Sequence, residues 1–376
     1  MQVRAAILEA MGAPRPYTDS RPLKIERIEL ARPGPGEIRV RIVAAGLCHS
    51  DLSVINGDRP RVMPMALGHE AAGVVDELGA GVEDLAVGDH VVLVFVPSCG
   101  CCLPCAEGRP ALCEPGAKAN GAGTLLSGAR RIAREGTPVL NHHLGVSGFA
   151  EQAVVSRRSA VRVPKDVPLD VAALFGCGVL TGVGAVVNTA RVQAGETVAV
   201  VGLGGVGLNA LLGASAAGAR AIVAVDLDPR KLELARTLGA TDVVDARAED
   251  AAERVKAIVP GGVDHAFEMA GSVKALDLAF RIAKRGGTTV TAGLPNPSNM
   301  LSLSPVTLVA EERTLKGSYV GGAVPLRDIP RYVEMWRRGR LPVDRLMSGR
   351  IGFDDLNAAF EKLAAGDVVR QILWLG

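Results

Sequence analysis

The sequence is poor in aromatic side chains and carries almost no excess of either charge. Its 376 residues include only seven Phe, three Tyr and two Trp, so a substrate pocket is expected to be lined mainly by aliphatic side chains. The 42 Lys and Arg residues are balanced by 40 Asp and Glu residues and are scattered along the chain. Nucleic-acid-binding proteins concentrate basic residues on one face, so the sequence does not favour that class.

Targeting and membrane signals are also missing. The opening residues, MQVRAAILEAMG, lack the uninterrupted apolar core of a secretory signal. The longest apolar region, 198–219, is long enough to cross a bilayer, but glycines interrupt it and a nucleotide-binding turn explains it better. With 48% apolar and 22% charged residues, we expect a soluble, cytoplasmic, folded protein.

Length and periodicity predict an α/β protein of two or three domains. Short strand-like runs, each bounded by Gly or Pro, fill the chain up to about residue 175. From 178 to 319 strands alternate with helices, which is typical of a doubly wound parallel sheet. The strands expected there are 197–201, 221–225, 242–244, 263–267 and 288–292. This predicts a nucleotide-type domain, 178–319, inserted into a β-rich domain formed by 1–177 and 320–376, with a long irregular insertion at 114–147.

A glycine-rich turn gives the first sign of chemistry. An apolar strand runs into GLGGVG at 202–207, a G-x-G-x-x-G pattern, and a helix follows. We expect Gly202 to allow the tight turn, Gly204 to let the backbone approach a pyrophosphate, and Gly207 to let helix and strand pack closely. Asp226 ends the next strand and would accept hydrogen bonds from ribose hydroxyls while repelling a 2′-phosphate, which favours NAD over NADP. The alternative is a structural turn followed by a surface aspartate.

Seven cysteines, five of them between residues 99 and 113, form the second pattern. Disulfides are disfavoured in a cytosolic protein, and a dense cluster there is more often a metal site. Four thiolates separated by three, three and eight residues can surround one tetrahedral ion, as in structural zinc sites. These four are Cys99, Cys102, Cys105 and Cys113. Cys101 is then a non-ligand; a ligand set that uses Cys101, or a loop of free thiols, is the alternative.

Three dispersed residues are candidates for a second metal centre. Cys48 lies in GLCHSD, His69 in GHEAAG, and Cys177 in FGCGVLTG. One His and two Cys leave a fourth coordination position for water or substrate, which is typical of a catalytic zinc. Taken singly, each has a structural interpretation as a buried thiol or a core imidazole, and the wide spacing does not by itself bring them together.

Together these motifs resemble the zinc-dependent medium-chain alcohol dehydrogenases. GLCHSD, GHEAAG, the four-cysteine cluster, GCG at 176–178 and GLGGVG occur in that family's order, and the resemblance extends to VVRQIL near the C-terminus. It implies a GroES-like catalytic domain, a Rossmann coenzyme domain, two zinc ions per subunit, and hydride transfer between an alcohol and NAD. The segment 114–147 resembles that of the longer, dimeric liver-type branch, so a homodimer is expected.

The resemblance also implies roles around the metal. The residues that match the catalytic zinc ligands are Cys48, His69 and Cys177. Glu70 matches a carboxylate behind the metal that binds it transiently in some states. Asp51 matches the carboxylate that orients the ligand histidine, and Ser50 matches the hydroxyl that takes the proton from the alcohol. Where liver enzymes continue the proton relay with a histidine, this sequence has Ser53, so the proton must leave through ribose hydroxyls and water or through His49.

Coenzyme contacts are implied in the same way. Asp226 and Lys231 match the residues that hold the adenosine ribose. His49 and Arg370 match the two cations at the pyrophosphate, with His49 in place of the more familiar arginine. The other cofactor-binding candidates are Thr181 and Val206 at the nicotinamide and Gly202, Gly204, Gly205 and Gly207 in the turn.

Two alternatives differ in activity. A glutathione-dependent formaldehyde dehydrogenase of the same family uses an arginine four residues after the last structural cysteine, but this sequence has Ala117 there, which would leave a glutathione carboxylate unpaired. A catalytically silent coenzyme-binding protein would hold one zinc or none, whereas the enzyme would hold two. The identity of the alcohol or carbonyl substrate does not follow from the sequence.

Overall fold

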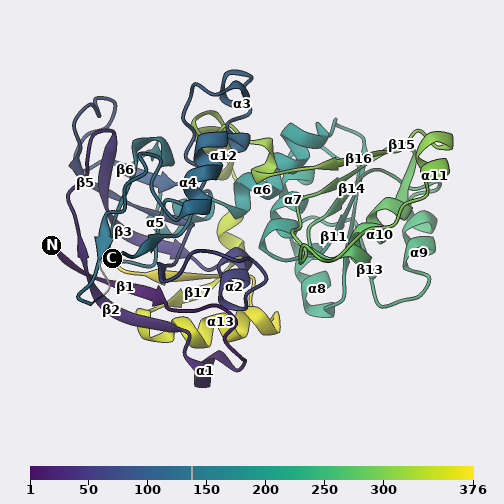
Figure 1. Ribbon diagram of the computed structural model, residues 1–376. Coiled ribbons are helices and arrows are strands. Elements are labelled where there is room, and N and C mark those ends of the chain that lie inside the picture. The colour runs from purple at the N-terminus through teal and green to yellow at the C-terminus, as the bar shows by residue number, and fades with distance from the viewer. Residues whose placement is uncertain (137–138) are drawn as a thin grey trace. The chain divides into compact units, whose positions relative to one another are not determined.

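The computed structural model describes residues 1–136 and 139–376. These residues divide into two compact units (Figure 1). The first unit comprises residues 1–177, 324–334 and 344–376, and the second comprises residues 178–323 and 335–343.

The first unit is built on two mainly antiparallel sheets. The five-stranded sheet has the order β7 (Ile132–Ala133), β2 (Leu23–Leu30), β1 (Gln2–Leu8), β4 (Met65–Ala66) and β8 (Asn141–His142). The seven-stranded sheet has the order β10 (Ala160–Val163), β6 (His90–Leu93), β5 (Ala71–Leu78), β3 (Glu37–Gly46), β18 (Arg370–Trp374) and β17 (Met347–Ile351), with β9 (Gln152–Ser156) also paired to β3. Because Ile372 lies opposite Gly46, the C-terminal strand β18 adjoins the end of β3.

Short helices connect these strands. They are α1 (Tyr17–Ser20), α2 (His49–Ile55), α3 (Leu103–Ala106), α4 (Glu114–Ala122), α5 (Leu169–Leu174), α13 (Leu356–Ala365) and α12 (Pro325–Arg337), whose last three residues belong to the second unit. The core between β1, β2 and their neighbours is aliphatic, with Ile7, Ile28 and Leu30 at most 2% exposed. In this core, branched aliphatic side chains pack closely and fill the space that aromatic side chains occupy in many other proteins.

The second unit is a parallel six-stranded sheet. Its order is β13 (Asp242–Asp245), β12 (Ala221–Asp226), β11 (Thr197–Val201), β14 (Val263–Glu268), β15 (Ala283–Thr291) and β16 (Thr314–Gly317). Its helices are α6 (Gly178–Gly184), α7 (Gly205–Ala216), α8 (Pro229–Thr237), α9 (Ala251–Ile258), α10 (Val273–Ile282) and α11 (Pro305–Ala310). Strand order reverses at β11, where β12 pairs on one side and β14 on the other. Ligands of such sheets bind at the carboxyl ends of the strands beside this reversal.

The predicted fold class is confirmed, with two local differences. Strand β15 begins at Ala283 rather than at residue 288. The sequence did not indicate this start, because residues 284–287 are polar or glycine and the pairing with β14 includes a register shift. The insertion 114–147 was expected to be irregular, but its described residues include α4, β7 and β8. The helix α4 begins after Cys113, whose sulfur accepts the N–H of Gly116, and ends at Gly123 with a φ of +66°. Residues 137 and 138 of this insertion lie outside the described residues.

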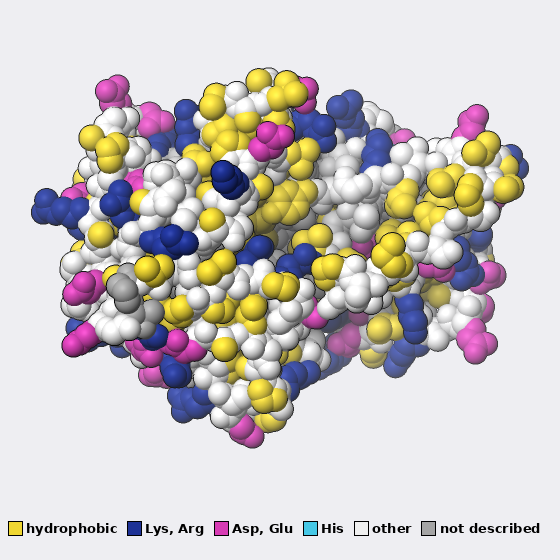
Figure 2. All heavy atoms as spheres, in the orientation of Figure 1, with side chains coloured by type: hydrophobic (Ala, Val, Ile, Leu, Met, Phe, Trp, Pro, Cys, Tyr) yellow, Lys and Arg dark blue, Asp and Glu magenta, His cyan; other side chains and the backbone are white. Residues whose placement is uncertain are grey.

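Two expectations from composition concern the surface and the membrane. Among the described residues, no helix is both long enough and apolar enough to span a bilayer, so the region 198–219 is instead the strand, turn and helix of β11 and α7. On the face shown in Figure 2, Lys and Arg side chains are interspersed with Asp and Glu and do not gather into one basic patch.

Candidate functional site

Two thiols, an imidazole and a carboxylate meet inside the first unit. Cys48 follows β3 and precedes α2. His69 and Glu70 lie between β4 and β5, and Cys177 follows α5. One ligand atom from each of the four lies within 4.8 Å of the others, and all four side chains are buried. The structure therefore brings the three dispersed candidates together and places Glu70 beside them.

Two glycines make room for this cluster. Gly68 has a φ of +93°, and a Cβ there would lie 2.4 Å from the backbone nitrogen of Phe149. Gly46 acts differently, because a Cβ on it would lie 2.3 Å from Oε1 of Glu70. Only a residue without a side chain at position 46 lets the Glu70 carboxylate occupy its place near the thiols.

Asp51 holds the imidazole of His69. The Nδ1 of His69 lies 3.0 Å from Oδ1 of Asp51, and both side chains are fully buried. The other oxygen, Oδ2, accepts the N–H of Cys48 at 3.2 Å. A carboxylate accepts hydrogen bonds, so Nδ1 carries a proton, and Nε2 is the nitrogen whose lone pair a metal could take in place of a second proton. Among the described residues, Nε2 has no hydrogen-bond partner, and this is the nitrogen available to a metal.

Neighbouring side chains shift the pKa values of the thiols and of His69. A hydrogen bond from the Cys177 thiol makes the largest contribution to lowering the pKa of Cys48. Burial lowers the pKa of His69, but the adjacent Asp51 carboxylate outweighs burial and raises the pKa well above its usual range. Asp51 thus stabilises positive charge at His69, whereas the hydrogen bond with Cys48 and burial raise the pKa of the Cys177 thiol well above its usual range.

Arg370 pairs with Glu70 beneath the cluster. Its Nη1 lies 3.2 Å from Oε2 of Glu70 and 3.3 Å from the carbonyl oxygen of Leu47. Burial raises the pKa of Glu70 to about 7, against the opposing effect of the guanidinium. The sequence interpretation assigned Arg370 to a pyrophosphate and did not reveal this ion pair. No local sequence pattern connects Arg370 with Glu70, which lies 300 residues earlier in the chain.

The first turn of α2 carries the remaining polar candidates. Ser50 is half-buried and His49 is exposed. The hydroxyl of Ser53 donates to the carbonyl oxygen of His49 at 2.8 Å, so it is occupied by the helix backbone.

A second buried histidine, His143, is the residue that sequence reasoning missed. Its Nδ1 lies 3.2 Å from Oδ1 of Asp51, and its ring meets that of His69 edge-on, with centroids 5.5 Å apart. The neighbouring His142 is equally buried, but its Nε2 accepts the N–H of Arg131 at 3.0 Å. The adjacent pair of histidines was the only signal in the sequence, and it does not indicate which of them faces Asp51.

The four cysteines of the other predicted centre also come together. The sulfur atoms of Cys99, Cys102, Cys105 and Cys113 all lie within 4.8 Å of one another. Backbone N–H groups of Cys101 and Cys102 lower the pKa of the Cys99 thiol to about 6. The sulfur of Cys113 also accepts backbone N–H groups, from Cys99 at 3.2 Å and Gly116 at 3.3 Å, although burial outweighs them and raises the pKa of this thiol. Such donors favour thiolates, the form of cysteine that binds metals.

Cys101 lies outside this group of four. Its side chain is exposed, and its Sγ lies 3.7 Å from Sγ of Cys99. The geometry therefore favours the ligand set that omits Cys101.

The GLGGVG segment forms the turn between β11 and α7. Gly202 has a φ of +94°, and a Cβ on Gly207 would lie 1.8 Å from the carbonyl oxygen of Gly202, so neither position accepts a side chain. A Cβ on Gly204, in contrast, would meet no atom within 4 Å. Gly205 and Val206 begin α7, whose first N–H groups have no carbonyl partner within the helix. An open space at a helix N-terminus suits an anion such as a pyrophosphate.

Asp226 stands beside this turn at the end of β12. Its Oδ2 accepts the N–H of Leu203 at 2.6 Å, and its Oδ1 accepts the N–H of Asp228 at 2.9 Å. Lys231, in α8, has no ion pair within the described ranges 1–136 and 139–376. Thr181, in α6, is half-buried.

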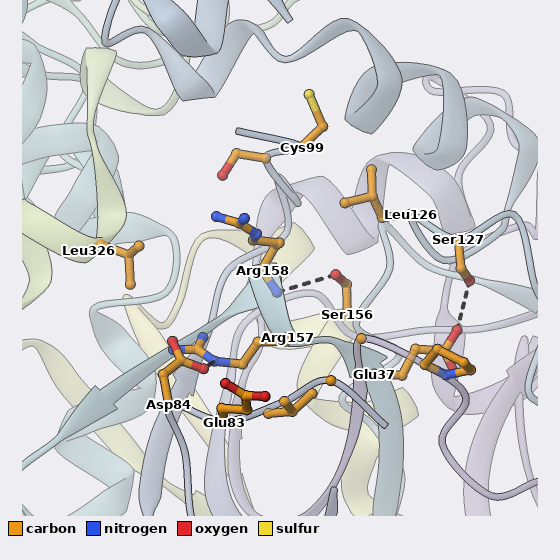
Figure 3. A pocket seen from close by; sticks show the side chains of 15 residues that line it. Glu37, Glu83, Asp84, Cys99, Leu126, Ser127, Ser156, Arg157, Arg158 and Leu326 are labelled. Atoms are coloured by element: carbon orange, nitrogen blue, oxygen red, sulfur yellow. Dashed lines mark hydrogen bonds and ion pairs between the residues drawn. The ribbon is translucent and has the colours of Figure 1, made fainter. Parts of the chain in front are cut away.

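A separate surface cavity of about 600 Å³ lies in the first unit (Figure 3). Its lining includes Glu83, Asp84, Arg157 and Arg158. Figure 3 shows Arg157 facing Asp84, and the two are ion-paired at 2.7 Å. Of the candidate metal ligands only Cys99 borders this cavity, so it is distinct from the buried cluster of Cys48 and His69.

Known proteins match both units. Residues 34–165 match the family described as alcohol dehydrogenase GroES-like domain, and residues 205–338 match that described as zinc-binding dehydrogenase. The chain is 38% identical over 359 residues to alcohol dehydrogenase class-3 of Myxine glutinosa, covering 94% of this chain and 95% of the relative.

Solved structures match over the same extent. An alcohol dehydrogenase zinc-binding domain protein from Burkholderia ambifaria superposes with a TM-score of 0.94 at 35% identity, covering 100% of this chain and 99% of that one. Benzyl alcohol dehydrogenase from Acinetobacter calcoaceticus superposes with a TM-score of 0.93 at 32% identity, covering 100% of both chains.

Proposed function

The chain belongs to the zinc-dependent alcohol dehydrogenases of the medium-chain dehydrogenase family, and on that basis we propose that it transfers a hydride reversibly between an alcohol and NAD. The observation that carries the proposal is the buried cluster whose ligand atoms lie within 4.8 Å of one another, formed by Cys48, His69, Glu70 and Cys177. Residues 1–177 and 320–376 would form the GroES-like catalytic domain, and residues 178–319 the Rossmann coenzyme domain.

The donor set fits a catalytic zinc. Two thiols and an imidazole are ligands that zinc prefers, and the partnerless Nε2 of His69 supports a metal at this position. Held by Cys48, His69 and Cys177, zinc would lower the pKa of an alcohol hydroxyl in one direction and polarise a carbonyl in the other. Asp51 would keep the His69 tautomer fixed, and Oε1 of Glu70, which also lacks a hydrogen-bond partner among the described residues, would approach the metal transiently.

Ser50 would take the proton from the alcohol. It follows Cys48 by two residues, and its half-buried hydroxyl has no hydrogen bond within the described part of the chain. Ser53 would not continue the relay, because its hydroxyl is bonded to the helix backbone. The proton would therefore leave through His49 or through the coenzyme ribose and water.

The turn after β11 would hold NAD. The pyrophosphate would lie at the N-terminus of α7, and Asp226 with Lys231 would bind the adenosine ribose. The carboxylate of Asp226 would repel a 2′-phosphate, which supports NAD over NADP. The other proposed coenzyme contacts are Gly202, Gly204, Gly205 and Gly207 in the turn, His49 and Arg370 at the pyrophosphate, and Thr181 and Val206 at the nicotinamide.

The four-cysteine cluster would hold a second, structural zinc, giving two zinc ions per subunit. Four thiolates leave no coordination position for substrate, so this ion would stabilise its lobe rather than react. All seven cysteines are free thiols, the form that both centres require, and a cytoplasmic setting, where thiols stay reduced, would suit them.

A homodimer would cover an apolar edge of the second unit. Strand β16 lies at the end of its sheet, and the adjacent α11 exposes Val306 by 73% and Val309 by 79%. Figure 2 shows apolar side chains gathered where Figure 1 draws α11. An edge strand beside exposed apolar residues is a site where a second copy would pair.

Glutathione-dependent formaldehyde dehydrogenase is the second candidate, supported by the 38% identity to a relative named alcohol dehydrogenase class-3. Ala117 weighs against it, because this exposed methyl of α4 cannot pair with a carboxylate. Activity with formaldehyde that appears only when glutathione is added would favour this candidate.

The test measures zinc content and NADH formation together. We expect two zinc ions per chain and NADH formation with short, long, branched or benzylic alcohols, and less reaction with NADP. Cys48→Ser should keep one zinc ion and lose activity, whereas Cys101→Ser should keep both. A protein that binds NAD and holds at most one zinc ion would support the silent coenzyme-binding alternative instead.

A further inference from the structure

The carboxylate of Asp51 faces two buried imidazoles. The Nδ1 atoms of His69 and His143 lie 3.0 and 3.2 Å from the same oxygen, Oδ1 of Asp51. His143 is 1% exposed and follows β8, where its N–H donates to the hydroxyl of Ser147 at 3.1 Å. Two segments distant in sequence therefore meet at one oxygen.

This geometry fixes the proton on Nδ1 of His69 and favours the same position on His143. The Nδ1 of His143 approaches the carboxylate to 3.2 Å without forming a hydrogen bond, and because a lone pair there would be repelled by Oδ1, the proton of the ring is favoured on Nδ1. Among the described residues, neither ring nitrogen of His143 has a hydrogen-bond partner, and Oδ1 of Asp51 is the charged atom that its Nδ1 approaches. An imidazole buried with an unpaired nitrogen is costly, which indicates that its contact with Asp51 serves a purpose.

We propose that His143 is a positioning residue for the catalytic zinc site. By packing against Oδ1 of Asp51 beside His69, it limits rotation of the carboxylate, and the carboxylate in turn fixes the direction of the His69 Nε2 lone pair. The backbone N–H of Cys48 anchors the other oxygen, so without His143 one side of the carboxylate would be free to turn. This inference rests on the proposed function, because it needs a metal at His69.

The neighbouring His142 provides a matched control. It is also 1% exposed, but its Nε2 accepts the N–H of Arg131 and its Nδ1 lies 3.5 Å from the hydroxyl of Ser147. Replacing either histidine with phenylalanine removes one buried imidazole and keeps an aromatic ring, whereas only the change at 143 removes the contact with Asp51.

The experiment follows zinc release from the purified, zinc-loaded protein to an excess of a chromogenic chelator. Two kinetic phases are expected, one from each zinc site. Cys48→Ser should remove one phase and Cys105→Ser the other, which assigns them. The structural-site phase then serves as an internal control for general loss of stability.

His143→Phe should speed release from the catalytic site by about tenfold or more, the usual effect of losing a partner behind a metal ligand, and leave the structural-site phase unchanged. His142→Phe should leave the catalytic-site phase near the wild-type rate. His143→Asn should restore most of the retention, because its amide N–H can face Oδ1 of Asp51.

Three results would overturn the inference: an unchanged catalytic-site phase in His143→Phe, equal acceleration in His142→Phe, or release from His143→Asn as fast as from His143→Phe. A wild-type protein that shows only the structural-site phase would overturn the proposed function itself, and this is seen before any histidine variant is compared.

Discussion

The guanidinium of Arg370 lies 3.2 Å from the carboxylate of Glu70, although 300 residues separate them in sequence. Strand β18 brings them together, because it pairs with β3 immediately beside the loop that carries Cys48. Both side chains are almost inaccessible, at 4% and 0% exposure. The C-terminal strand thus supplies the cation that pairs with the buried carboxylate of Glu70.

Removing Arg370 should therefore destabilise the fold. Arg370→Met leaves the buried carboxylate of Glu70 without its cation, and we expect a loss of about 3 kcal/mol in the free energy of unfolding, measured with urea. Arg254→Met, which breaks the exposed pair with Asp250, should cost less than about 1 kcal/mol. Equal losses in the two variants would contradict the prediction.

Gly46→Ala should disturb the metal cluster itself. The added methyl would lie 2.3 Å from Oε1 of Glu70, so the carboxylate must leave its present place in the cluster. We expect weaker zinc retention at the catalytic site and a loss of stability of about 1–3 kcal/mol. Gly121→Ala, where a Cβ would meet no atom within 4 Å, should be neutral or slightly stabilising. Zinc titration and urea unfolding of both variants check this. Wild-type zinc retention and stability in Gly46→Ala would show that the Glu70 carboxylate can move without cost, which would contradict the prediction.

His142 should make stability depend on pH in acid. Burial lowers its pKa to about 4, whereas a histidine in the unfolded chain titrates near 6.5. The unfolded state therefore binds the proton first, so stability is present in full above about pH 6.5 and is lost as the pH falls toward 4. The free energy of unfolding lost over this pH range is about 3 kcal/mol. In His142→Asn, the free energy of unfolding should depend less on pH across this range than it does in the wild type. Identical pH dependence in the two proteins would refute the prediction.

Cys101→Ser should keep the structural zinc, and Cys105→Ser should lose it. The sulfur of Cys105 lies within 4.8 Å of the other three in its group, whereas Cys101 is exposed beside the group. Zinc content by mass spectrometry gives the answer directly. Loss of an ion from Cys101→Ser would show that the ligand set uses that cysteine.

Local patterns predicted much of the fold and one of the two candidate metal sites. The strands of the parallel sheet, the glycine turn and the spacing of the four cysteines all follow from contiguous sequence, because neighbouring residues there share one element. The proximity of Cys48, His69 and Cys177 required the family resemblance, since three separate loops carry them.

What the sequence could not predict depends on tertiary contacts. The pairing of Arg370 with Glu70 and the approach of His143 to Asp51 arise from strand pairing and loop packing between distant segments. Helix α4 was missed for a different reason, since its Gly- and Ala-rich residues show no clear amphipathic period and its start depends on the backbone N–H accepted by Cys113.

The most direct test is anomalous diffraction from crystals of the purified protein on both sides of the zinc absorption edge. The account predicts two peaks per chain, one among Cys48, His69 and Cys177 and one among the four clustered cysteines. A single peak at the four cysteines, in a protein that still oxidises alcohols with NAD, would contradict it.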